Sequence, residues 1–123
     1  MQLGKDLVAA SAAPLVLGVL AEGDSYGYAI LQRIGELSGG EFDWSEGLLY
    51  PLLHRLERQG HVESRWGTAE SGRRRRYYAL TRSGRAALAD HRAQWDAVHA
   101  TLSQVWRGLG FAASGSARLA WAA

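Results

Sequence analysis

Hydrophobic residues recur at helical spacing along most of the chain, and only one region alternates in the way that strands do. Residues 3–20 are rich in Leu, Val and Ala and predict a first helix. A second helical stripe follows, with apolar residues at positions 26, 30, 31, 34 and 37. Asp24 or Ser25 is expected to cap this second helix, because each side chain can accept a bond from a free N–H group. The glycine pair at 39–40 ends it.

A third helix is predicted after the glycine pair. Its leucines fall on one face and are expected to form the core: Leu49, Leu52, Leu53 and Leu56. Asp43 or Ser45 is the expected N-cap, and Gly60 is the expected left-handed terminator. Pro51 is tolerable here because it lies near the helix start, and the carbonyl that it crowds belongs to Gly47.

Two short strands are predicted at residues 61–67 and 73–81, joined by a polar, glycine-containing loop. In the first strand Val62, Ser64 and Trp66 alternate with charged residues. The second begins with four successive arginines. A half-buried strand would bury two of them at high cost, so the arginines favour the exposed tip of a hairpin. Thr81 is the expected N-cap of the next helix.

The last helix is predicted from about residue 82 to 108, which at 1.5 Å per residue makes it roughly 40 Å long. A helix of that length extends beyond so small a domain. Its hydrophobic positions form two series with a spacing of seven: Leu88, Trp95, Leu102 and Leu109, and His91, Val98 and Val105. Such a heptad seam predicts a partner helix, most simply a second copy of the chain. Residues 110–123 lack periodicity and are expected to form a mobile tail.

The predicted order is three helices, a β-hairpin and a long helix, which is a mainly α fold with a small β-hairpin (α+β). This order is that of a winged helix-turn-helix, in which the third helix enters the major groove and the hairpin, or wing, lies on the DNA backbone. We therefore expect a DNA-binding domain over residues 1–81, whose first helix also reaches the dimer interface. A dimerisation helix over residues 82–109 and a tail over 110–123 follow.

Charge is distributed unevenly, although the net charge is only +2. Residues 1–44 hold six acidic and two basic side chains, whereas residues 45–85 hold nine arginines and four glutamates. A basic block of this kind predicts a polyanionic partner. Double-stranded DNA is the partner that agrees with the predicted fold.

The candidate DNA-contacting residues lie in the third helix and the wing. Gly47 allows a close approach to the DNA backbone, and the polar side chains supply donors for phosphates or base edges. The helix contributes Ser45, Gly47, Tyr50, Pro51, His54, Arg55 and Arg58. The wing contributes Arg73, Arg74, Arg75, Arg76 and Tyr77. A solvated charged surface is the alternative interpretation of the four arginines.

Other classes of function find little support in the sequence. The absence of cysteine excludes disulfides and cysteine-based catalysis or metal binding. His91 and His99 are eight residues apart, which is not the spacing that chelates a metal on one helix. No catalytic triad, paired carboxylates or phosphate-binding glycine motif stands out. We expect a cytoplasmic protein without enzymatic activity, cofactor or metal, and no secretory leader or membrane partner.

Three segments together resemble the PadR family of bacterial transcription regulators. They are GDSYGYAILQRI, LLYPLLHRLERQGHVESRW and GRRRRYYALTRSG, and the match runs from about residue 15 to 90. The resemblance implies a homodimeric winged-helix repressor that binds a near-palindromic operator. Arg73 departs from the pattern by replacing a wing glycine.

The short final helix is similar to the small-member branch of this family, which includes multidrug-sensing members. That resemblance implies that Trp95 lies beside its symmetry mate and binds a small, planar aromatic effector. The other residues implied at this site are Leu7, Ala10 and Pro14 of the first helix, and Val98 and His99. Pro14 and Gly18 depart from the pattern, so the resemblance does not identify the effector.

Several alternatives remain open at this point. Trp95 can instead simply fill the dimer seam. Trp44, Trp66 and Trp106 are expected in the core or at an interface. The winged-helix dimer can also be a small-molecule-binding or protein-interaction module without specific DNA binding. A metal-responsive regulator is a third alternative, which the missing cysteines and the histidine spacing disfavour.

Overall fold

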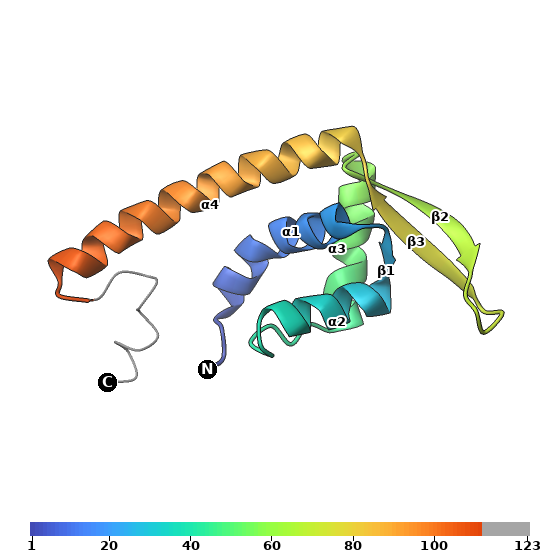
Figure 1. Cartoon of the computed structure of the whole chain (residues 1–123), viewed down its shortest axis with the longest axis horizontal. Helices are drawn as coiled ribbons and strands as arrows, with labels where there is room; N and C mark the ends of the chain where they lie inside the picture. The colour runs from blue at the N-terminus through green and yellow to red at the C-terminus, as the bar shows by residue number, and fades with distance from the viewer. Residues whose placement is uncertain (112–123) are drawn as a thin grey trace. The chain divides into compact units, whose positions relative to one another are not determined.

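The computed structural model describes residues 1–111 and shows four helices with a three-stranded antiparallel sheet (Figure 1). This confirms the predicted α+β winged-helix fold. The elements in chain order are α1 Lys5–Glu22, β1 Ser25–Tyr26, α2 Gly27–Leu37, α3 Glu46–Arg58, β2 Val62–Thr68, β3 Arg74–Leu80 and α4 Arg82–Gly108. The part of the predicted tail from residue 112 onward lies outside the described residues.

Two compact units make up the chain, Met1–Ala89 and a second that begins at Asp90. The first unit thus extends beyond the wing into the start of α4. Gly84 is buried there, and Ala87 and Leu88 pack against the core of the first unit. The rest of α4 belongs to the second unit.

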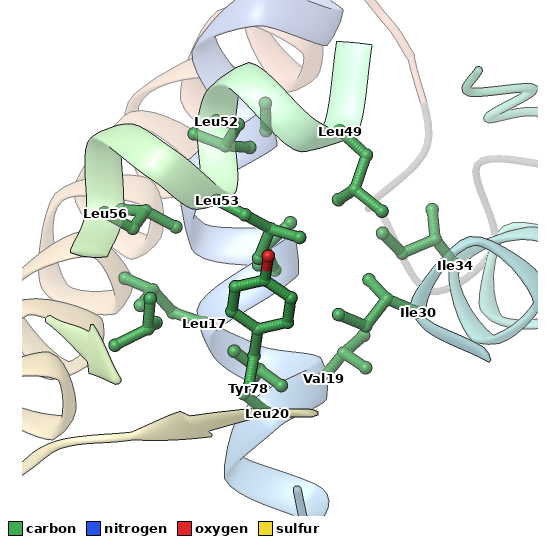
Figure 2. Packing of buried hydrophobic residues seen from close by; sticks show 13 residues of the cluster. Leu17, Val19, Leu20, Ile30, Ile34, Leu49, Leu52, Leu53, Leu56 and Tyr78 are labelled. Carbon is green, nitrogen blue, oxygen red and sulfur yellow. The ribbon is translucent and has the colours of Figure 1, made fainter. Parts of the chain in front are cut away.

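The hydrophobic core of the first unit lies between the three short helices and the sheet (Figure 2). It contains side chains from every one of these elements except β1, among them Leu17 and Leu20 of α1, Ile30 and Ile34 of α2, Leu49, Leu52, Leu53 and Leu56 of α3, Val62 of β2 and Tyr78 of β3. The four leucines of α3 are all buried, as their spacing predicts. Their burial leaves the opposite face of α3 exposed.

The sheet has one strand more than the sequence predicts. The short strand β1 pairs with β3, and the strand order is β1-β3-β2. Ser25 lies opposite Tyr78 and Tyr26 opposite Tyr77. The N-cap of α2 is therefore Tyr26, and the expectation of Asp24 or Ser25 is wrong. Two residues are too few to show the alternation that identifies a strand.

The two ends of α3 differ from each other in how well they match the prediction. Ser45 occupies the N-cap position, but its side chain makes no capping hydrogen bond. Gly60 ends the helix with a positive φ of 81°, and the His61 N–H donates to the carbonyl of Leu56 over 2.9 Å. Only glycine adopts this conformation without strain, so the predicted terminator is confirmed.

The start of α4 is bonded to the end of α3. The Gly84 N–H donates to Thr81 Oγ1 over 3.0 Å, which confirms Thr81 as the N-cap. The hydroxyls of Thr81 and Ser83 both donate to the carbonyl of Gly60, over 2.6 and 2.8 Å. These bonds fix the point where β3 passes into α4 against the end of the third helix.

Candidate nucleic-acid interface

The face of α3 opposite its leucines is polar, basic and exposed. Gly47, Pro51, His54, Arg55 and Arg58 all lie on it with exposed side chains or backbone. Within residues 1–111, neither Arg55 nor Arg58 has a hydrogen-bond or ion-pair partner for its guanidinium group. Both groups are available to a ligand from solution.

Tyr50 lies on the same helix but is half-buried, because its ring rests on the first residue of α2. A Cβ at Gly27 would overlap the Tyr50 hydroxyl and lie 2.8 Å from Cζ. The ring of His54 lies 6.5 Å from that of Tyr50. Gly27 therefore determines how Tyr50 is seated at the edge of the exposed face, a role that spacing alone does not indicate.

The wing is a regular hairpin in which the partners of each pair lie on the same face of the sheet. Trp66 is paired with Arg76, Gly67 with Arg75 and Thr68 with Arg74. At the tip, the Ala69 N–H donates to the Arg73 carbonyl over 2.8 Å, and Gly72 has a φ of 86°. Arg73, Arg74 and Arg76 are exposed and Arg75 is half-buried, which agrees with the prediction of an exposed tip.

Aromatic rings contact the wing arginines on both faces of the hairpin. Arg74 lies over Trp66 at 4.8 Å, and Arg75 lies over Tyr26 at 4.0 Å. The sequence predicts Trp66 in the core or at an interface. The residue is 57% exposed, which excludes the core. A cation–π contact with a ring does not use the N–H groups of a guanidinium as hydrogen-bond donors to an oxygen acceptor. The rings thus hold the side chains of Arg74 and Arg75 without using their donors.

Tyr77 and Tyr78 separate the two faces at the base of the wing. Tyr78 is 1% exposed and its ring points into the core (Figure 2), where burial raises its pKa. Tyr77 is half-buried on the other face and packs edge-on against Tyr26, with ring centroids 5.8 Å apart. A Cβ at Gly67 would lie 2.7 Å from the Tyr77 ring. The ring of Tyr77, a predicted DNA contact, is therefore packed between Tyr26 and Gly67 on the surface of the sheet.

Two arginines of the hairpin have acidic partners. Arg76 Nη2 lies 3.6 Å from Glu57 Oε1 of α3, and Arg65 Nη1 lies 3.0 Å from Asp24 Oδ2. Ser64 links the first pair, since it donates to Glu57 Oε2 over 2.6 Å and accepts from Arg76 Nε over 3.0 Å. The arginines of the wing therefore differ in how far their charge is already compensated.

An open groove of about 360 Å³ separates the exposed edge of α3 from the wing. Its lining residues come from β1, α2, α3 and the hairpin and are mostly aromatic or basic: Tyr26, Gly27, Tyr50, His54, Trp66, Arg74, Arg75, Arg76 and Tyr78. Of the predicted DNA contacts, the groove thus brings together Tyr50 and His54 of α3 with Arg74, Arg75 and Arg76 of the wing, and the other predicted residues lie outside its lining.

The residues predicted for the dimer interface lie along α4. Val98, Leu102, Val105 and Leu109 are exposed and His91 and Trp95 are half-buried, whereas Leu88 packs on the core of the first unit. Of the remaining predicted effector residues, Leu7 and Ala10 are exposed and Pro14 is half-buried on α1. His99, on α4, is also exposed. The α1 residues and Trp95 belong to different units.

Residues 1–111 contain neither a membrane span nor a metal-binding cluster. None of the helices there is long and apolar enough to cross a membrane. No three histidine, aspartate or glutamate side chains in that part of the chain lie close enough together to hold a metal ion.

A helix with an exposed basic face, followed by an arginine-rich hairpin across a cationic groove, defines a winged-helix DNA-binding protein. Residues 16–90 match the model of the transcriptional regulator PadR-like family. The chain belongs to this family, and it is a DNA-binding transcriptional regulator rather than an enzyme.

Relatives and solved structures agree with this assignment. The uncharacterized protein X of Lysinibacillus sphaericus is 30% identical over 104 residues, which cover 85% of this chain and 95% of that protein. The transcriptional regulator YqjI of Escherichia coli is 31% identical over 68% of this chain, but only 39% of YqjI is covered. A transcriptional regulator from Clostridium thermocellum has a similar structure, with a TM-score of 0.74 and 29% identity over 81% of this chain and 97% of its own.

Proposed function

We propose that the protein is a homodimeric repressor that places α3 in the major groove of a near-palindromic operator and the wing on the adjacent phosphates. The groove between α3 and the wing carries this proposal, because its two walls present donors toward a shared cationic space. Phosphate contacts fix the register of a protein on DNA, whereas side chains on the inserted helix read base edges. Residues of α3 are therefore the sequence readers, and those of the wing supply affinity. A DNA partner in a bacterial cell also places the protein in the cytoplasm.

The apolar side chains of α4 support the homodimer. Val98, Leu102, Val105 and Leu109 are each more than two-fifths exposed and follow the heptad spacing. Covering such a stripe by the same stripe of a second copy would give the twofold symmetry that a palindromic operator requires.

We expect the protein to bind a fragment of its own promoter region with an affinity that falls steeply with salt. The measurement is fluorescence anisotropy between about 50 and 200 mM salt, where several phosphate contacts reduce the affinity by orders of magnitude. Footprinting of the same fragment should give two protected half-sites about one helical turn apart. Binding that is weak, or equal for an unrelated sequence, would instead favour a small-molecule-binding or protein-interaction dimer.

Release of the repressor by a small planar aromatic effector at the dimer interface is the second part of the proposal. It is motivated by the heptad position of Trp95 and by the exposed apolar residues nearby on α4, where Ala97, Val98, Thr101 and Leu102 line a shallow pocket of about 310 Å³. Flat aromatic compounds pack well between aromatic side chains. An effector held there would act on the helix that joins the two copies.

Replacing Trp95 by alanine is expected to weaken the binding of planar cationic dyes at least about tenfold, since it removes the stacking surface. The measurement is a dye titration monitored by tryptophan fluorescence, with dye fluorescence as the readout for the variant. Trp106→Ala is the matched control, because Trp106 lies on the same helix but outside the two heptad series. Equal dye binding by Trp95→Ala and the native chain would refute the effector site.

A further inference from the structure

Glu57, Ser64 and Arg76 form a closed triad of two hydrogen bonds and one ion pair between the last turn of α3 and the base of the wing. The two carboxylate oxygens of Glu57 are used separately, Oε2 by the Ser64 hydroxyl at 2.6 Å and Oε1 by Arg76 Nη2 at 3.6 Å. Arg76 Nε donates to Ser64 Oγ over 3.0 Å. Each member of the triad therefore contacts the other two, and the three come from α3, β2 and β3.

We propose that Arg76 is a positioning residue, which with Glu57 sets the wing against α3, and that the phosphate contacts of the wing rest on Arg73, Arg74 and Arg75. The proposal deepens the proposed function and rests on it for the DNA-binding part. It divides four arginines that are indistinguishable in the sequence into two groups with different tasks.

The guanidinium of Arg76 already has two polar partners in the free protein. Two of its three nitrogens face Ser64 and Glu57, and one side of its guanidinium lies toward the Trp66 ring at 5.7 Å. Turning Arg76 toward a phosphate would break its hydrogen bond to Ser64 and its ion pair with Glu57. It would also leave the Glu57 carboxylate without its cation beside a polyanion, where like charges repel.

Arg74 and Arg75 are held differently, and this difference supports the division. The guanidinium of each lies over an aromatic ring, with Arg74 Cζ 4.8 Å from the Trp66 centroid and Arg75 Cζ 4.0 Å from the Tyr26 centroid. Neither has an acidic partner among residues 1–111, and the same holds for Arg73 at the tip. Their in-plane N–H groups therefore remain available, and the stacked side chains of Arg74 and Arg75 lose less conformational freedom when they bind.

The salt dependence of DNA binding separates the two roles. The informative variant is the double substitution Glu57→Gln with Arg76→Gln, because it leaves the net charge unchanged. We expect it to retain the native log–log salt slope while affinity falls by a similar factor at every salt concentration. A reduction of the slope by about 1.8, the value expected when each half of a dimer binds one phosphate fewer, would overturn the proposal. Arg74→Gln is the matched comparison and should show that reduction.

The single variant Glu57→Gln distinguishes most clearly between a phosphate-binding and a positioning role of Arg76. If Arg76 were a phosphate contact, removing a nearby negative charge would strengthen DNA binding. If Glu57 and Arg76 together position the wing, the same substitution weakens it, by about threefold or more. The double variant should then lose little beyond what either single variant loses, because both substitutions break one linkage. Stronger binding by Glu57→Gln would contradict the inference.

A measurement without DNA keeps this inference separate from the proposed function. Each single variant should lower the melting temperature by roughly 2–4 °C and the double variant by a similar amount rather than by the sum. Amide hydrogen exchange of residues 62–68 and 74–80 should accelerate in all three. Additive melting shifts with unchanged exchange would refute the positioning role. Native protein that binds no DNA, with the expected coupling intact, would refute only the proposed function.

Discussion

Replacing Arg73, Arg74 and Arg75 together by alanine is expected to reduce the affinity for operator DNA at least about a hundredfold at 0.15 M salt. Each phosphate contact contributes about 0.9 to the log–log salt slope, so three contacts in each half of a dimer would reduce the slope by about 5. The three side chains are at or near the wing tip and none has an acidic partner among the described residues. Anisotropy titrations over a range of salt concentrations measure both quantities.

The charge-matched control replaces Lys5, Arg92 and Arg107, three cations that lie outside α3 and the wing. It removes the same net charge and is expected to change the salt slope by less than about 1. The two triple variants should differ in melting temperature by no more than a few degrees, since exposed charges contribute little to stability and the cation–π contacts of Arg74 and Arg75 contribute about 0.5–1 kcal/mol each. Similar losses of affinity in both variants would show that overall charge, rather than the wing, attracts the DNA.

Replacing Gly84 by alanine is expected to destabilise the first unit by about 3 kcal/mol, at the upper end of the usual cost of overpacking. A Cβ at this position would overlap the carbonyl oxygen of His61 and lie 2.7 Å from Leu80 Cδ1. The His61 oxygen belongs to the backbone and also accepts the Thr81 N–H over 3.1 Å, so it cannot move away alone. Urea or thermal unfolding of the variant measures the loss.

Gly35→Ala is the matched control, since it makes the same substitution inside α2. A Cβ at Gly35 would meet no obstructing atom within 4 Å. Alanine there should therefore stabilise the helix by up to about 1 kcal/mol. The two substitutions should therefore change the stability in opposite directions. Destabilisation by Gly35→Ala of the same size as by Gly84→Ala would mean that the close approach of α4 to His61 is not the cause.

Features that depend on hydrophobic periodicity could be predicted from the sequence. The spacing of Leu49, Leu52, Leu53 and Leu56 places these leucines in the core and hence identifies the exposed face of α3. The four arginines predict an exposed hairpin tip because burying two of them would be too costly. Gly60 and Thr81 are confirmed as helix boundaries, since their roles depend on local backbone chemistry.

Features that depend on contacts between distant segments could not be predicted. The strand β1 exists because Ser25 and Tyr26 meet β3, more than fifty residues away in the chain. Gly27 and Gly84 are required by Tyr50 and by His61, neighbours in space that no local pattern reveals. The pairing of Arg76 with Glu57 also needs the fold, because the four consecutive arginines differ only in what the sheet places beside them.

The acidic residues Asp24 and Glu57 beside the wing also bear on how strongly the protein binds non-specific DNA. Asp24 and Glu57 compensate the charges of Arg65 and Arg76, so these arginines shape the hairpin without adding to its attraction for arbitrary DNA. Affinity for non-specific sequence comes almost entirely from uncompensated cations, and a chromosome offers millions of competing sites. Under the proposed function, in which α3 reads the operator, compensating these two arginines would lower the affinity for non-specific sites more than the affinity for the operator.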